Sequence, residues 1–165
     1  MDRPGRTKRG PAIATSVAVA GVVGVLALRI WVLEPVTVAS SSMEPTVARG
    51  DTVVLSHVVP PVGESLAGRV VALRDPQDGQ ITLKRVAAEG GQTLAIRDGV
   101  LYVDEVPVAE PYVDPRSTDG TFFHNVTVPD GHLFVLGDNR VDSVDSRDFG
   151  VVPVEDVTAT VLWTF

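Results

Sequence analysis

The chain of 165 residues contains no cysteine, which excludes a disulfide framework, a thiol nucleophile and a cysteine-based metal site. Lysine is almost as scarce, because Lys84 is the only lysine among the ten basic residues of positions 11–165. The other nine are arginines, which stay protonated near neutral pH, whereas a lysine in suitable surroundings can lose its proton. The composition therefore singles out Lys84 as a candidate for proton transfer.

Positive charge is also sparse beyond the N-terminal tip. Residues 1–11 carry four Lys or Arg residues and one Asp, a net charge of +3, whereas residues 12–165 carry ten basic and twenty acidic residues, a net charge of −10. A body this acidic argues against a nucleic-acid partner, because such proteins bind the phosphate backbone through Lys and Arg.

An uncharged, apolar stretch follows the basic tip. Residues 12–28 contain no charged side chain, and a helix of about 17–25 residues crosses a bilayer. The apolar run continues past Arg29 to residue 33, and Trp31 suits the membrane interface. By the positive-inside rule we expect a cytoplasmic tail (1–11), one transmembrane anchor (12–33) and an extracytoplasmic domain (34–165), which places the protein in the plasma membrane.

A cleaved signal peptide is the alternative to a retained anchor. It would have the same basic and apolar regions, and Thr-Val-Ala at 37–39 resembles a cleavage site. The apolar region of a signal peptide usually has about 7–15 residues. Here Arg29, Glu34 and Pro35 separate the apolar region from residues 37–39, which favours the anchor.

The remainder of the chain has the pattern of a β protein. Its apolar runs are short and β-branched, and Gly and Pro residues lie between them. An Asp-Gly pair at 98–99 between two such runs is typical of a two-residue hairpin. We therefore predict a mainly β fold, an antiparallel barrel or sandwich, with residues 110–129 forming a surface loop. The expected strands are 36–39, 52–57, 69–73, 81–87, 93–96, 100–103, 132–136 and 157–163.

Three polar segments carry the candidate chemistry. The first is Ser-Ser-Ser-Met-Glu-Pro-Thr at 40–46, the second is the Lys84-Arg85 pair within an apolar run, and the third is Gly-Asp-Asn-Arg-Val-Asp-Ser-Val-Asp-Ser-Arg at 137–147. Taken singly they could be a turn, an exposed strand lysine and a charged loop. The third lacks the glycine and the glutamate that a calcium-binding EF-hand loop requires, so we expect no metal site.

Together, in this order and behind an apolar N-terminal stretch, the three segments resemble the type I signal peptidases, the membrane-bound Ser-Lys leader peptidases. The family's Ser-Met-x-Pro-Thr box matches residues 42–46, its strand-borne Lys-Arg pair matches 84–85, and its Gly-Asp-Asn-Arg-x-x-Ser-x-Asp-Ser-Arg box matches 137–147. One departure is Ala-Ala-Glu-Gly-Gly-Gln at 87–92, where the family usually has Gly-Leu-Pro-Gly-Asp.

The resemblance implies a serine endopeptidase that removes signal peptides from exported preproteins and cuts after small residues. Ser42 would be the nucleophile and Lys84 the general base, a known variant of the catalytic triad. The backbone N–H of Ser42 and the Ser40 hydroxyl would hold the oxyanion, and Ser143 would orient Lys84. The reaction needs no cofactor and no metal; the partners are preproteins and the lipid bilayer.

The same resemblance assigns structural support of the site to Asp138, Asp145 and Arg147. By their positions in the sequence, several small or apolar side chains are candidates for the walls of a shallow substrate pocket. These are Val38, Ala39, Met43, Val47 and Leu83.

Several related functions stay open at this point. The chain could be a specialised Ser-Lys processing peptidase, of the pilin-maturation, conjugation or mitochondrial inner-membrane type. It could also be a catalytically inactive, anchored β domain that binds signal peptides or an envelope partner. A soluble self-cleaving Ser-Lys repressor is disfavoured by the apolar N-terminal stretch. The sequence leaves the oligomeric state and the particular preproteins undetermined.

Overall fold

The computed structural model describes residues 21, 32–58, 64–114, 118 and 122–165. The chain divides into two compact units, Met1–Leu33 and Glu34–Phe165. Almost all of the expected anchor, residues 12–33, lies outside the described residues. Among the residues that are described, no helix combines the length and the apolar character needed to cross a membrane. The account below concerns the second unit.

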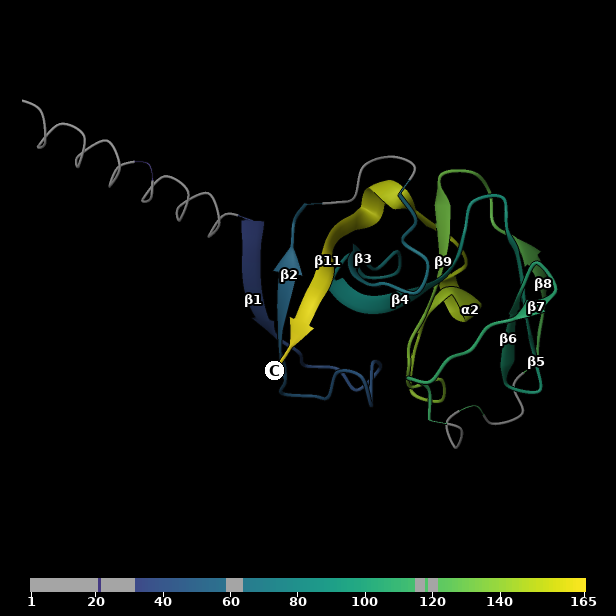
Figure 1. Ribbon diagram of the computed structural model, residues 1–165, viewed down its shortest axis with the longest axis horizontal. Helices are drawn as coiled ribbons and strands as arrows, with labels where there is room; N and C mark the ends of the chain where they lie inside the picture. Colours follow the sequence, from purple (N-terminus) through teal and green to yellow (C-terminus); the bar gives the residue numbers. More distant parts are fainter. Residues whose placement is uncertain (1–20, 22–31, 59–63, 115–117, 119–121) are drawn as a thin grey trace, which may run out of the picture. The chain divides into compact units, whose positions relative to one another are not determined.

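Two antiparallel sheets make up this unit (Figure 1). The seven-stranded sheet has the order β1-β2-β11-β3-β4-β9-β10, and the four-stranded sheet has the order β7-β6-β5-β8. The larger sheet consists of β1 (Leu33–Thr37), β2 (Thr52–Ser56), β3 (Val70–Arg74), β4 (Ile81–Glu89), β9 (His132–Leu136), β10 (Val152–Pro153) and β11 (Val157–Thr164). The smaller sheet consists of β5 (Thr93–Arg97), β6 (Val100–Val103), β7 (Val106–Pro107) and β8 (Phe123–Thr127).

The predicted mainly β, antiparallel fold is confirmed. Seven of the eight expected strands occur within two residues of their predicted bounds, and the first begins and ends earlier than expected, at Leu33 and Thr37. The Asp-Gly hairpin is also present, because Arg97 pairs with Val100 and both turn residues, Asp98 and Gly99, have positive φ angles.

The prediction of a surface loop over 110–129 was wrong in part, because β8 lies within it. This strand is at the edge of the smaller sheet and exposes His124 and Asn125. An edge strand with polar, exposed side chains lacks the apolar alternation by which strands are recognised in a sequence.

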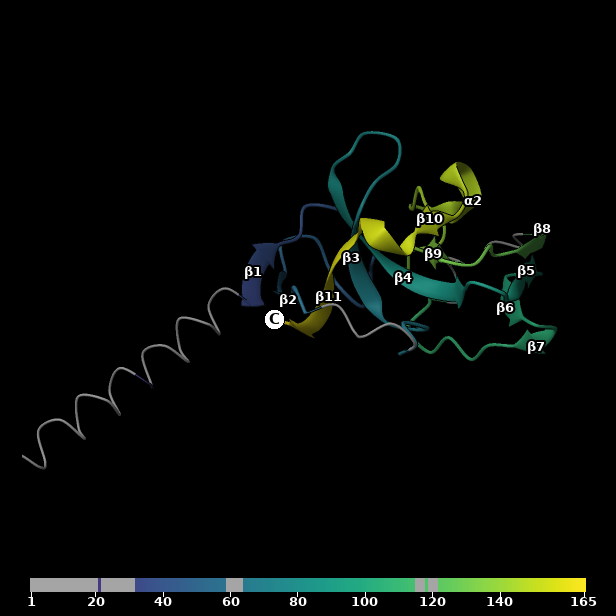
Figure 2. The ribbon, with the colours of Figure 1, turned by 90° about the horizontal axis from the view of Figure 1, so that it is seen from above.

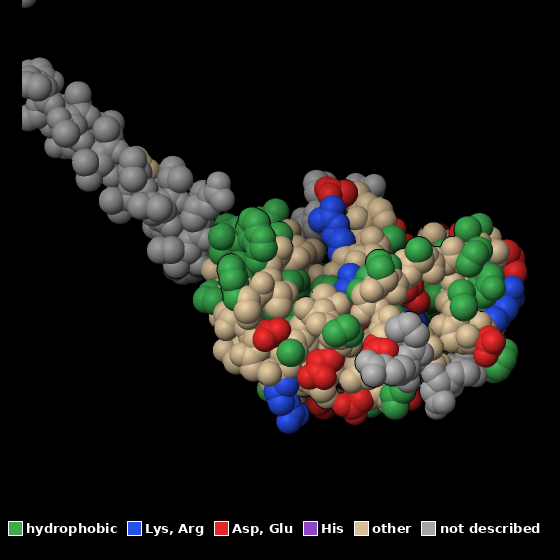
Figure 3. Space-filling view, turned by 60° about the horizontal axis from the view of Figure 1, so that its bottom comes forward, with side chains coloured by type: hydrophobic (Ala, Val, Ile, Leu, Met, Phe, Trp, Pro, Cys, Tyr) green, Lys and Arg blue, Asp and Glu red, His purple; other side chains and the backbone are tan. Residues whose placement is uncertain are grey.

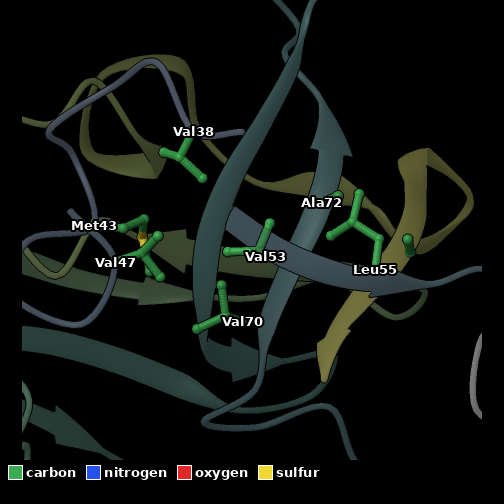
Figure 4. Packing of buried hydrophobic residues seen from close by; sticks show 8 residues of the cluster. Val38, Met43, Val47, Val53, Leu55, Val70 and Ala72 are labelled. Carbon is green, nitrogen blue, oxygen red and sulfur yellow. The ribbon is translucent and has the colours of Figure 1, made fainter. Parts of the chain in front are cut away.

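Three apolar clusters form the core. The first packs Met43 and Val47, from the turn that follows β1, beside Val53 and Val70 of β2 and β3 (Figure 4). The second lies around Val71, Leu73, Val86 and Val135.

The third cluster joins the two sheets, since Phe134 and Leu136 of β9 pack with Leu94 and Ile96 of β5. Seen from above, the smaller sheet lies beyond β4 and β9, at the end away from β1 and β2 (Figure 2). The fold therefore separates β1 and β2 from the smaller sheet and leaves β4 and β9 between them.

Candidate active site

The turn at residues 40–47 fixes the position of Ser42. Val47 donates a backbone hydrogen bond to the Met43 carbonyl at 2.9 Å, and Glu44 donates to the Ser41 carbonyl at 3.1 Å. The side chains of Met43 and Val47 are almost completely buried in the first core cluster. Apolar burial of these two residues thus fixes the backbone on the C-terminal side of Ser42, which is itself 4% exposed.

Lys84 reaches Ser42 from the neighbouring part of the larger sheet. It lies on β4 opposite Val71 of β3, and its Nζ is 3.1 Å from Ser42 Oγ. Lys84 is only 3% exposed. Burial lowers the pKa of Lys84, because it disfavours the charged ammonium, and the carboxylates of Asp145 and Asp75 oppose this effect.

The 3.1 Å contact between Lys84 Nζ and Ser42 Oγ suits both protonation states of the lysine. A protonated amine donates to Ser42 Oγ, and a neutral amine accepts the hydroxyl proton across the same distance. The arrangement can therefore activate a hydroxyl without a large movement of either side chain.

Ser40 lies beside the same turn. The backbone N–H of Ser42 donates to Ser40 Oγ at 3.2 Å. This contact brings together the two groups that the resemblance assigns to the oxyanion hole, and Ser40 is exposed to solvent.

Two buried carboxylates hold the loop at 137–147. Asp138 is fully buried and accepts two hydrogen bonds from Arg85, at 2.8 and 2.6 Å. Asp145 is also fully buried and accepts from the Gly137 N–H at 2.9 Å and from the Arg147 guanidinium at 2.8 and 2.9 Å. These ion pairs explain Asp138 and Asp145 as partners of arginines.

Asp145 has a second structural role at the start of the short helix α2 (Ser146–Phe149). It is the N-cap, and its side chain forms a capping box with Asp148. An N-cap carboxylate accepts from backbone N–H groups that have no partner within the helix. Asp145 therefore links α2 to the loop at Gly137.

Ser143 lies against Gly137, and its hydroxyl is unpaired in the described part of the chain. Ser143 Oγ is buried and has no hydrogen-bond partner in the described part of the chain. A Cβ atom added to Gly137 would lie 2.2 Å from Ser143 Oγ and 2.6 Å from the Ser42 carbonyl oxygen. Only a glycine fits this point, where the loop at 137–147 touches the turn that carries Ser42. The expected hydrogen bond from Ser143 to Lys84 is not among the described contacts.

Other contacts between the loop and the turn were not foreseen from the sequence. Asn139 donates its backbone N–H to the Ser42 carbonyl at 3.0 Å and its side-chain amide to the Ser41 carbonyl at 3.3 Å. The Ser41 hydroxyl donates to Asp142 at 2.5 Å. Asn139 and Asp142 both belong to the 137–147 box, so the signal was present in the sequence, but nothing there showed which segment they would contact.

A cleft of about 670 Å³ opens beside Ser42. Four of the five expected wall residues line it: Val38, Ala39, Met43 and Leu83. The fifth expectation needs correction, because Val47 is fully buried in the first core cluster and is not part of the lining. The rest of the lining includes Val36, Leu55 and Ile81, with Glu34 and His57 also at the cleft.

The comparisons with known proteins identify the family of the chain. The family model described as "Signal peptidase, peptidase S26" matches residues 10–165. The chain is 37% identical to the "Probable signal peptidase I-1" of Synechocystis, over 85% of this chain and 74% of that protein. It is 31% identical to "Signal peptidase I T" of Bacillus subtilis, over 94% of this chain and 83% of that protein.

A solved structure adds the fold to this evidence. The crystal structure of a signal peptidase I from Enterococcus faecalis matches 60% of this chain and 97% of that one, with 31% identity and a TM-score of 0.54. With a family model that matches almost the whole chain and relatives above 30% identity over most of it, the chain belongs to the signal peptidase family, peptidase S26, and is a serine endopeptidase of the signal peptidase I type.

Proposed function

We propose that this protein is a membrane-anchored endopeptidase that removes signal peptides from exported preproteins by Ser-Lys acyl transfer. The observation that carries the proposal is the contact of 3.1 Å between Lys84 Nζ and Ser42 Oγ, made between two side chains that are almost completely buried. A desolvated lysine within hydrogen-bond reach of a hydroxyl is the arrangement that such catalysis needs.

In the first step Ser42 Oγ attacks the carbonyl carbon of the scissile peptide bond while neutral Lys84 takes the hydroxyl proton. The tetrahedral intermediate collapses, the C–N bond breaks, and Lys84 gives the proton to the leaving amine, which is the new N-terminus of the mature protein. Water then attacks the acyl-enzyme and loses a proton to Lys84. The ester C–O bond breaks, Lys84 returns the proton to Ser42 Oγ, and the signal peptide leaves with a new C-terminal carboxyl group. The residues present are sufficient for these proton transfers.

The oxyanion would be held by the backbone N–H of Ser42 and the hydroxyl of Ser40. In the absence of substrate this N–H is directed at Ser40 Oγ. A developing oxyanion would accept the N–H in place of Ser40 Oγ, and the Ser40 hydroxyl would rotate to donate to it. The hydroxyl would then act mainly in the transition state, and an interaction of that kind raises kcat.

Ser143 is proposed to orient Lys84 during the reaction. An ammonium has three N–H donors, and the described contacts of Lys84 use one of them, on Ser42. Ser143 Oγ is buried and has no hydrogen-bond partner among the described residues, and in this proposal it supplies an acceptor for Lys84. A hydrogen bond between the two would satisfy a buried hydroxyl and fix the lysine. Asp138, Asp145 and Arg147 are proposed to support this loop through their ion pairs.

The cleft supports a peptide substrate in extended form. β4 pairs with β3 over residues 81–85 and with β9 over 85–89, so residues 81–83 have an unpaired backbone edge on the other side among the described strands. Residues 81–83 also line the cleft that contains Ser42. An extended peptide can add to such an edge by main-chain hydrogen bonds, and the neighbouring apolar walls, Val38 and Ala39 among them, suit small apolar side chains next to the cut.

The membrane part of the proposal follows the sequence: a cytoplasmic tail at 1–11, an anchor at 12–33 and an extracytoplasmic domain at 34–165. Hydrophobic side chains gather over the end of the domain formed by β1, β2 and β11 (Figure 3). Trp163 of β11 is 66% exposed and Phe165, just after β11, is 77% exposed. β1 follows the anchor directly in the sequence. Apolar side chains exposed on the sheet that begins with the first strand after the anchor in the sequence are compatible with a membrane surface nearby.

The direct test uses the full chain in detergent with a preprotein that carries an Ala-x-Ala site. We expect the wild type to release the mature protein, and N-terminal sequencing to place the cut after the second alanine. Ser42→Ala should release none, whereas Ser65→Ala, which removes an exposed hydroxyl, should act like the wild type. Cleavage by Ser42→Ala at the normal rate would overturn the proposal.

Two further measurements separate the alternatives. A serine-directed acylating reagent should label Ser42 in the wild type, and failure to label it would favour an inactive binding domain. A panel of preproteins, including pilin-like substrates, would distinguish a general enzyme from a specialised one. For the topology, protease added to right-side-out vesicles should digest the domain at 34–165, and protection of that domain would contradict the proposed orientation.

A further inference from the structure

The connection between β7 and β8 of the smaller sheet contains a segment, residues 110–113, with an unexpected set of contacts. Residues 110–113 follow β7 and end at Val113, which is 8% exposed. The side chain of Glu110 is only 9% exposed, and Tyr112 is half-buried. Burial of a carboxylate and a phenol in a connecting segment costs free energy unless both find partners, so their partners indicate what the segment does.

The first contact route starts at the Glu110 carboxylate. One of its oxygens accepts hydrogen bonds from the guanidinium of Arg140 and, at 3.2 Å, from the Tyr112 hydroxyl. Arg140 is 5% exposed and also donates its Nε–H to the Gly137 carbonyl at 3.0 Å. Gly137 touches both Ser143 and the Ser42 carbonyl. Glu110 is therefore connected to the nucleophile's turn through one arginine and one glycine.

The second route starts at the Tyr112 ring. The Arg85 guanidinium lies over this ring at 3.7 Å from its centroid, a cation–π contact. Arg85 follows Lys84 on β4 and donates two hydrogen bonds to Asp138, the residue after Gly137. Tyr112 therefore packs against the side chain that ties β4 to the active-site loop.

The Tyr112 hydroxyl remains a donor at any working pH. Burial and the nearby Glu110 carboxylate raise the pKa of Tyr112 to about 12. A hydroxyl that stays protonated keeps its hydrogen bond to Glu110, so the two routes remain joined at that carboxylate while Lys84 titrates.

The first route ends at Gly137, which contacts the Ser42 carbonyl, and the second ends at Arg85, the neighbour of Lys84 in sequence. We propose that Glu110 and Tyr112 are positioning residues for the reaction, which set the distance between Lys84 and Ser42 by holding Arg85 and Arg140. This inference rests on the proposed Ser-Lys function. It assigns the segment at 110–113 to the active site, although it comes directly from the smaller sheet.

The smaller sheet supplies a matched control with the same three residue types. Arg97 donates to Glu105 at 2.8 and 2.9 Å, and its guanidinium lies over the Tyr102 ring at 4.9 Å from the centroid. The side chains of Arg97 and Glu105 are 43% and 63% exposed. The other described side-chain contact of Arg97, with Asn125, also lies within the smaller sheet.

The experiment compares variants of the full chain in detergent, each normalised to the amount of enzyme that reacts with an acylating reagent. Glu110→Gln keeps the shape and weakens the ion pair, Tyr112→Phe keeps the ring and removes the hydroxyl, and Tyr112→Leu removes both. The matched controls are Glu105→Gln, Tyr102→Phe and Tyr102→Leu. The measurements are kcat, KM, the pH profile of kcat/KM and the midpoint of thermal unfolding.

We expect Glu110→Gln and Tyr112→Leu to lower kcat by roughly 10- to 100-fold, the effect of a misplacement of about 1 Å or less, with little change in KM. The midpoint of the kcat/KM profile should also move, because the surroundings of Lys84 change. Tyr112→Phe should retain more activity than Tyr112→Leu, because the ring still faces Arg85. The three control variants should leave kcat and the midpoint as in the wild type.

The outcomes distinguish this inference from the function on which it rests. If Ser42→Ala abolishes cleavage but Glu110→Gln and Tyr112→Leu match their controls in kcat and midpoint, the positioning role is wrong and the function stands. Lower thermal stability with unchanged kcat per reactive enzyme would also overturn it. If Glu110→Gln does not fold, the two Tyr112 variants provide the test. A lower kcat for Tyr112→Leu than for Tyr112→Phe would support the inference, and equal kcat values at the wild-type level would overturn it.

Discussion

The two sheets of this protein share an antiparallel topology and an apolar core, but they differ in what else they bury. In the described part of the chain, the buried polar side chains lie on or beside the seven-stranded sheet and none lies on β5 to β8. They are Ser42, Ser56, Lys84, Asp138, Arg140, Asp145, Ser146 and Thr160. The smaller sheet keeps its charges at the surface.

The ion pairs show the same difference. In the pairs Arg85–Asp138 and Arg147–Asp145 the side chains are 0–13% exposed, whereas those of Arg97–Glu105 on the smaller sheet are 43% and 63% exposed. An exposed pair contributes about 0–1 kcal/mol to stability, but removing one partner of a buried pair costs about 3–5 kcal/mol. A well-packed apolar pair is often as stable as a buried ion pair, so stability alone gives no reason to bury these charges. Their position around Ser42 and Lys84 supports the proposal that they serve the reaction.

Exchange of lysine and arginine should give the largest contrast between the sheets. Lys84→Arg keeps the positive charge but cannot release its proton at working pH, so it should be as inactive as Lys84→Ala, with kcat reduced by about 10⁴-fold or more. Arg97→Lys on β5 should leave kcat unchanged. Steady-state cleavage of a preprotein checks both.

Residual activity of Lys84→Arg near the wild-type level would show that Lys84 is not the base. A related expectation concerns the wild type, whose kcat/KM should rise with pH through the lowered pKa of Lys84, because kcat/KM reports the ionisation of the free enzyme. A pH-independent kcat/KM would contradict the same assignment.

Removal of a hydroxyl gives the next contrast. Ser40→Ala should reduce kcat by roughly 10²- to 10³-fold with little change in KM, since an oxyanion donor acts mainly in the transition state. Thr93→Ala on β5 removes a hydroxyl that contacts the Thr127 hydroxyl at 3.2 Å and should leave kcat unchanged. An unchanged kcat in Ser40→Ala would leave the Ser42 N–H as the single proposed donor.

Two glycines have no room for a Cβ atom, one beside the active site and one between β4 and β5, so the effect of added steric strain can be compared at the two places. A Cβ at Gly137 would lie 2.6 Å from the Ser42 carbonyl, and a Cβ at Gly90, between β4 and β5, would lie 2.9 Å from the Asp130 Cα. Both alanine variants should lose about 1–3 kcal/mol of stability through overpacking. Gly137→Ala should also lower kcat of the folded enzyme by about 10²-fold, because it displaces Ser42, whereas Gly90→Ala should not.

The measurement for the glycine pair is kcat per active enzyme together with the free energy of unfolding in urea. Equal kcat values for the two variants would show that the contact at Gly137 is a matter of packing and does not set the position of the nucleophile.

The strands of both sheets were predictable from the sequence to different degrees. Local alternation and turn residues located most strands, and the Asp-Gly pair gave the β5–β6 hairpin. β8 escaped because an edge strand with exposed polar residues has no apolar period, and α2 escaped because a helix of four residues is too short to show one.

The site was predictable in its residue types but not in its contacts. The resemblance pointed to Ser42 and Lys84, and the structure places them 3.1 Å apart. The contacts of Glu110 and Tyr112 could not be inferred, because their partners Arg140 and Arg85 are about 30 residues away in sequence. Val47 was wrongly expected to line the cleft for a similar reason. Its position shortly after the nucleophile in the sequence does not tell whether its side chain faces the cleft or the core.

The smallest expected effect concerns stability and follows from the burial of Lys84. Its pKa in the folded protein is lowered from 10.5, so between the folded pKa and about 10.5 the unfolded chain binds more protons than the folded one. Stability therefore rises with pH across this window, and the cost of burying Lys84 is greatest below it. Lys84→Met replaces the amine by an apolar side chain of similar length and removes that cost.

We therefore expect Lys84→Met to be inactive but more stable than the wild type near neutral pH, with a gain that shrinks as the pH rises toward 10. Asp145, Asp75 and Arg147 are the charged groups that act on Lys84. Both proteins retain them, so the pH-dependent difference between the two proteins isolates the lysine. Urea unfolding at pH values from 6 to 10 measures this difference in stability.

The control is Arg97→Met, at an exposed position, whose stability should differ from that of the wild type by an amount that does not change with pH. If the stability gain of Lys84→Met were also independent of pH, the folded protein would not lower the pKa of Lys84. The buried charges of the larger sheet would then need an explanation other than proton transfer.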